Sequence, residues 1–106
     1  MELTTLEQHA LLAIVALKSN AYGIAIQDHI AQTARYEPSV GGLYAALDRL
    51  GEKGFVKSKQ GEATAERGGR RKLYFSITAP GQKALSQSLK AVNSLGRAAG
   101  FKEALA

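Results

Sequence analysis

The chain has 106 residues and a formal net charge of +5, with 45% hydrophobic and 22% charged residues. This length fits one domain with a limited core, and the basic balance favours polyanionic partners, nucleic acid before anionic membrane, while charge alone leaves an inert basic surface as an equal alternative. Cysteine is absent, which excludes disulfides, thiolate metal sites and thiol nucleophiles.

The first 34 residues predict two helices. The first runs from Thr4 or Thr5, which form a capping-box pattern with the acidic or amide residue three positions later, to about Lys18. Its apolar residues cover more than one face, which suggests burial on a second side by another subunit. The second runs from about Tyr22 to Ala34, with an inward side formed by Ile24, Ile26 and Ile30.

A third helix is expected to begin at Ser39, because Pro38 disfavours helix before it and serine is a good N-cap. Leucines at positions 43, 47 and 50 form one stripe toward the core. Gly54 is expected to end this helix.

The remaining residues predict a hairpin and a last helix. Strands are expected over residues 55–60 and 71–77, joined by a polar, glycine-containing loop, with Leu73, Phe75 and Ile77 alternating toward the core. Thr78 caps the last helix, whose apolar residues follow a heptad-like spacing. We therefore expect an α+β, mostly helical chain divided into residues 1–78 and a dimerisation helix over residues 79–106.

Two features indicate nucleic-acid binding. Outside the core stripe, the third helix presents hydrogen-bonding side chains and two glycines that let a phosphate approach closely; an ordinary amphipathic core helix is the open alternative. The hairpin gathers most of the excess positive charge at its tip, which suits phosphates or a minor groove, although charge also protects edge strands. The predicted DNA contacts are Ser39, Gly42, Tyr44, Arg49, Lys57, Lys59, Arg67, Arg70, Arg71 and Lys72.

Three segments resemble the PadR family of transcriptional regulators. Residues 41–50 and 54–56 are similar to its signature, a Gly-x-Leu-Tyr-x-x-Leu-x-Arg-Leu helix followed by a glycine and an apolar strand. Residues 21–26 resemble the Tyr-Gly opening of its second helix, and residues 69–81 resemble its wing strand and Thr-x-x-Gly helix start. The chain departs from the family at Gly42, where Thr or Ser is common, and at Asp48, where a basic residue is frequent.

The resemblance implies a winged helix-turn-helix repressor that binds double-stranded DNA in the cytoplasm as a homodimer, through its first and last helices. A winged helix that docks an acidic protein partner is the alternative function. The dimer interface either holds a small apolar or aromatic effector or closes as an apolar seam. The predicted interface residues are Leu6, Leu11, Leu85, Leu89, Val92 and Leu95.

No enzymatic activity, cofactor, metal or membrane partner is expected. His9 and His29 lack a cysteine or carboxylate pair at metal-binding spacing. The glycine-rich loop lacks the Gly-Lys-Ser/Thr pattern of nucleotide-binding loops. The longest apolar run, residues 10–17, is far below the ~20 residues that span a bilayer, and Glu2 and Glu7 stand where a signal peptide carries positive charge.

Overall fold

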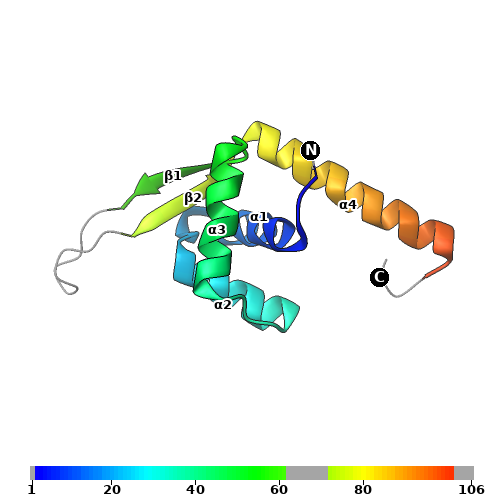
Figure 1. Ribbon diagram of the computed structural model, residues 1–106, viewed down its shortest axis with the longest axis horizontal. Coiled ribbons are helices and arrows are strands. Elements are labelled where there is room, and N and C mark those ends of the chain that lie inside the picture. Colours follow the sequence, from blue (N-terminus) through cyan, green and yellow to red (C-terminus); the bar gives the residue numbers. More distant parts are fainter. Residues whose placement is uncertain (1, 62–71, 102–106) are drawn as a thin grey trace.

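The computed structural model describes residues 2–61 and 72–101, so much of the predicted cationic loop lies outside the described residues. The elements are α1 (Thr5–Leu17), η1 (Lys18–Asn20), α2 (Gly23–Ala34), α3 (Val40–Glu52), β1 (Val56–Gln60), β2 (Leu73–Ile77) and α4 (Ala79–Ala99). Helices α1, α2 and α3 pack together, the hairpin extends to one side, and α4 extends to the other as a long arm (Figure 1). This is a winged helix-turn-helix, as the sequence predicts.

Side-chain caps set the starts of three helices. The Thr4 hydroxyl accepts from the Glu7 amide at 3.1 Å, and the Glu7 carboxylate accepts from the Thr4 amide in return, so the predicted capping box is confirmed. Ser39 and Thr78 accept from the amides of Gly42 and Gly81 in the same way. Helix α2, in contrast, begins at Tyr22 without a side-chain hydrogen bond to its first turn.

The core lies between the three helices and the inner face of the hairpin. It contains the predicted leucine stripe of α3, with other apolar residues of α1, α2, the strands and the start of α4. Ile26 and Ile30 are buried as predicted, but the inward placement of Ile24 is wrong, since its side chain is 63% exposed. Two residues turn a helix by about 200°, so Ile24 and Ile26 cannot face the same side.

The hairpin is antiparallel, with Val56 opposite Ile77. The Phe75 amide also donates to the Ala21 carbonyl at 2.8 Å, so the chain before α2 is tied to β2. Leu73 lies on the same face of the strand as Phe75, as predicted, but its side chain is 40% exposed. It pairs with Gln60 at the end of the strand farthest from Val56 and Ile77, where it lines a groove beside α3 and is not buried in the core.

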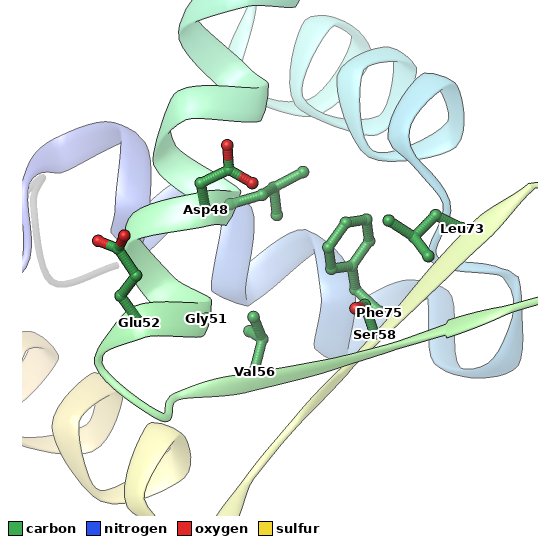
Figure 2. Close-up of a pocket in the computed structure, with 8 residues that line it drawn as sticks. Asp48, Gly51, Glu52, Val56, Ser58, Leu73 and Phe75 are labelled. Carbon is green, nitrogen blue, oxygen red and sulfur yellow. The ribbon is translucent and has the colours of Figure 1, made fainter.

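A groove separates α3 from the hairpin (Figure 2). Its volume is about 420 Å³, and it is lined by Leu47, Asp48, Gly51, Glu52, Val56, Ser58, Leu73 and Phe75. Asp48 and Glu52 lie one turn apart on the α3 wall and are among the residues that line this groove. The side of α3 nearest the wing is therefore acidic.

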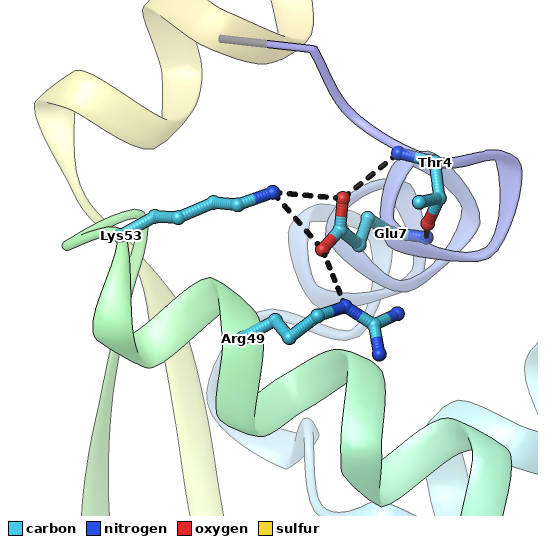
Figure 3. Close-up of polar contacts among 4 residues, drawn as sticks. All are labelled: Thr4, Glu7, Arg49 and Lys53. Atoms are coloured by element: carbon cyan, nitrogen blue, oxygen red, sulfur yellow. Dashed lines mark hydrogen bonds and ion pairs between the residues drawn. The ribbon is translucent and has the colours of Figure 1, made fainter.

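A buried carboxylate joins α1 to the end of α3 (Figure 3). Glu7 is fully buried, and it accepts hydrogen bonds from the Thr4 amide at 2.8 Å, Arg49 Nε at 3.0 Å and Lys53 Nζ at 3.1 Å. Burial by itself would raise the pKa of Glu7, but the Thr4 amide and the cations of Lys53 and Arg49 outweigh it and hold the pKa below its usual value. Glu7 is therefore the ionised partner of both cations at neutral pH.

Helix α4 is held at its start and extends away from the core beyond it. Leu85 is buried and Leu89 packs against the core, whereas Val92 and Leu95 are 54% and 72% exposed. The helix continues past Gly96 to Ala99 and ends at Gly100, which has a φ of 71°. No helix among the described residues is long and apolar enough to cross a membrane.

We expect Glu7→Gln to reduce the free energy of unfolding by about 1–3 kcal/mol, because the amide keeps the cap but loses the charge that pairs with two cations. Urea unfolding at pH 7 measures the change. Glu52→Gln, which makes the same chemical change at an exposed position of α3, should stay within about 0.5 kcal/mol of the wild type. Equal effects of the two variants would contradict the structural role of Glu7.

The Glu7 contribution should also depend on pH. A carboxylate whose folded pKa lies below its unfolded value of about 4.3 stabilises fully above that value, and its contribution disappears as pH falls through the folded pKa. The difference in unfolding free energy between the wild type and Glu7→Gln should therefore be constant from pH 8 to 6 and shrink between pH 5 and 3. A difference that does not change across this range would show that Glu7 is not ionised in the folded protein.

Candidate nucleic-acid interface

The exposed start of α3 carries the residues predicted to read DNA. Ser39 caps the helix, so its oxygen is occupied by the Gly42 amide while its hydroxyl hydrogen remains available to donate. A Cβ on Gly42 would lie 2.8 Å from the Ser39 oxygen, so this glycine makes room for the cap. Val40, Gly41 and the α3 residues beyond them on the outer side are exposed. The first two turns of α3 thus present a narrow, small-residue surface to a partner.

Tyr44 connects this surface to the start of α2. Its ring lies so close to Gly23 that an added Cβ there would overlap the Tyr44 hydroxyl and come within 2.6 Å of Cζ. The first-turn amides of α2 have no acceptor within the helix, and Tyr22 supplies no side-chain cap. The Tyr44 hydroxyl and the positive end of the α2 dipole therefore lie together, an arrangement suited to a phosphate.

The base of the wing adds aromatic rings and cations beside that point. Tyr22 and Tyr74 pack edge to face with ring centroids 5.5 Å apart, and Lys72 Nζ lies 4.2 Å from the centre of the Tyr22 ring. The strand register places Lys57 and Lys59 on the face of the hairpin that carries Tyr74, opposite the face that packs on the core. Lys57, Lys59 and Lys72 therefore form one cationic face with the two tyrosines, which we call the wing face.

Three of the predicted cations cannot be placed on this surface. Arg67, Arg70 and Arg71 lie outside the described residues, and their contribution stays a prediction. The wing face, among the described residues, carries the three cations Lys57, Lys59 and Lys72.

Arg49 lies elsewhere, on the flank of α3 that faces α1. Its Nε donates to Glu7, and its side chain is 45% exposed, so its outer nitrogens remain accessible at the edge of the surface. Lys53 is held by the same carboxylate. The sequence holds a signal for this pair, since Arg49 and Lys53 are four residues apart and face one side of the helix. Their shared partner, 42 and 46 residues away, was not apparent from spacing alone.

The structure divides the predicted dimer residues into two groups. Leu11 and Leu85 are buried in the core of the single chain, and Leu6 and Leu89 are partly buried against the same core. Val92 and Leu95 remain exposed. The chain itself therefore covers part of the apolar surface predicted to meet a partner, and the interface stays a prediction. Exposed apolar side chains on α1 that the interface prediction omitted are Leu12 and Val15.

Nothing in the described residues resembles a metal centre. No group of three or more metal-binding side chains comes together within residues 2–61 and 72–101. His9 instead contacts another side chain, with its Nδ1 2.5 Å from the Tyr36 hydroxyl, and this contact joins α1 to the segment before α3.

Comparisons with solved structures identify the fold. A transcriptional regulator from Clostridium thermocellum is similar with a TM-score of 0.76 and 24% identity, over 92% of this chain and 88% of that one. A PadR family transcription regulator from Clostridium difficile R20291 has a TM-score of 0.69 and 22% identity, over 89% and 96%. A structure of a complex of hsRosR has a TM-score of 0.65 and 25% identity, over 87% and 74%.

Sequence comparison gives the family. No curated protein matches the chain significantly. The model of the transcriptional regulator PadR-like family, however, matches residues 11–87, which include α2, α3, the hairpin and the Tyr44–Gly23 contact. This match covers most of the chain, and the chain therefore belongs to the PadR-like family of transcriptional regulators.

Proposed function

We propose that this protein is a repressor that binds a pseudo-palindromic DNA operator as a homodimer in the cytoplasm. The observation that carries the proposal is the arrangement of three exposed features side by side: the start of α3, the uncapped start of α2, and the wing face. In helix-turn-helix proteins the recognition helix, which corresponds to α3 here, enters the major groove, and neighbouring elements contact the backbone.

The arrangement suggests a division of roles. Ser39 and the exposed start of α3 would meet base edges, where Gly42 makes room for the Ser39 cap and Gly41, whose Cβ direction is open, lets a partner approach closely. The Tyr44 hydroxyl, together with the first-turn amides of α2, would hold one phosphate. Arg49, with one nitrogen committed to Glu7, would reach a phosphate at the edge rather than a base. The wing face would supply most of the attraction to the backbone.

A second copy would cover the exposed apolar side chains of α4 and α1. Val92 and Leu95 lie on the part of α4 that extends beyond the core, and Leu12 and Val15 are exposed on α1. Pairing through these residues would place two α3 helices about 34 Å apart, one helical turn of DNA. A small apolar or aromatic effector, if the protein binds one, would lie in this seam.

The basic wing gives the first prediction for DNA binding. The dimer should bind random duplex DNA at low salt, and Arg70→Ala with Arg71→Ala should weaken all duplexes about equally. The logarithmic salt slope should fall by up to ~2, one for each lost phosphate contact. A gel-shift titration at several salt concentrations measures both. A folded dimer that binds no duplex would favour docking to an acidic protein instead, and an unchanged slope would contradict the wing assignment.

The position of Tyr44 gives a second prediction for DNA binding. Tyr44→Phe keeps the ring against Gly23 and removes only the hydroxyl, so the fold should be unaffected while DNA affinity falls about two- to tenfold. Since a phosphate contact carries no sequence information, the affinities for operator and for random duplex should fall by the same factor. Tyr36→Phe, at a tyrosine that contacts His9 away from this surface, is the matched control and should bind normally. A loss confined to the operator would place the hydroxyl on a base.

A further inference from the structure

The chemistry of the exposed start of α3 restricts which bases it can read. Guanine is read mainly by bidentate Arg or Lys, and adenine by bidentate Asn or Gln. Helix α3 contains no Asn, Gln or Lys, and its single Arg is held by Glu7 on the flank that faces α1. Lys53, just after the helix, is held by the same carboxylate. None of the usual purine-reading side chains is therefore available at its N-terminal end.

The other polar groups near this end offer little more. The Ser39 oxygen caps the helix and leaves only its hydroxyl hydrogen to donate, and the Tyr44 hydroxyl is directed at Gly23 of α2. Asp48 lies more than two turns from the helix start, about 13 Å along the axis, and faces the groove beside the wing. Its carboxylate is poorly placed for the bases that meet the first turns.

What the start of α3 does present is methyl groups. Val40, the first residue of the helix, has a side chain that is 57% exposed, and Ala45 is exposed one and a half turns later. Valine at an exposed helix start gains nothing from core packing, and its β-branched side chain has a lower helix propensity than most. In the major groove only thymine offers an apolar partner, its 5-methyl group. The two residues differ by about 7.5 Å along the helix axis and by about 140° around it, so they would meet different bases of one half-site.

We propose that α3 reads the operator through thymine 5-methyl groups, with Val40 and Ala45 as the contacting residues. This inference rests on the proposed DNA-binding function and specifies its ligand: a half-site with at least two thymines, one for each residue. The ion pairs of Glu7 contribute to this base preference, because they hold the cations of Arg49 and Lys53 away from the base edges.

The experiment removes single thymine methyl groups from the operator DNA. The wild-type dimer selects its operator from a pool of random duplexes, and each thymine in the half-site is then replaced by deoxyuridine, which removes the 5-methyl group and leaves the base pair intact. We expect about a fourfold loss of affinity at each of two thymines, the effect of exposing one buried methyl. Deoxyuridine at thymines outside the half-sites should change nothing.

Protein variants then test which residue contacts which thymine methyl group. Val40→Ser should abolish the deoxyuridine effect at one thymine and Ala45→Ser at the other, as a double-mutant cycle would show. Ala34→Ser, a serine substitution at an exposed position at the end of α2, is the matched control, and the ratio of thymine to deoxyuridine affinity should remain at about four. The serine substitution barely changes helix propensity relative to valine.

The possible outcomes distinguish failure of the thymine assignment from failure of the proposed DNA-binding function. If the protein selects a defined operator but deoxyuridine has no effect, or if the selected positions are G·C pairs, the thymine assignment is wrong while the repressor proposal stands. An operator rich in cytosine at the centre of each half-site would indicate Asp48 as the reader and would likewise overturn it. Absence of binding to any duplex would overturn both proposals.

Discussion

The position of the recognition helix depends on one buried carboxylate. Glu7 has no exposed surface, and an ionised carboxylate in the interior is tolerated only when charges and hydrogen bonds surround it. Here the Thr4 amide, Arg49 and Lys53 surround the carboxylate. Thr4 lies at the start of α1, and the two cations lie at the end of α3. Because each partner has a fixed direction, the network determines how α3 lies on α1 in a way that apolar packing by itself does not.

The same network distributes charge over the molecule. Two cations that would otherwise lie free on α3 are held on its α1 side, while Asp48 and Glu52 remain on its wing side. A helix with this charge distribution offers little attraction to a phosphate backbone. In the proposed DNA complex the attraction would come mainly from the wing face, where Lys57, Lys59 and Lys72 lie beside aromatic rings, and from the amides at the start of α2. Attraction and discrimination would then come from different elements.

Tyr44 and Gly23 show how a sequence motif acquires its physical meaning. In sequence they belong to separate segments, each resembling part of a family signature. In the structure the tyrosine ring occupies the space that any side chain at position 23 would need. The pairing of a glycine at the start of α2 with an aromatic residue on α3 therefore fixes the two helices of the DNA-binding unit against each other at the point where a phosphate would bind.

The sequence by itself determined the order of elements, the caps at Thr4, Ser39 and Thr78, and the leucine stripe of α3, because these depend on neighbours within a few residues. It did not determine where Ile24 points, that Leu73 stays exposed, which apolar residues of α1 and α4 the chain covers itself, or that Arg49 pairs with Glu7. Those outcomes are decided by contacts between residues far apart in the chain, and only the tertiary structure brings such residues together.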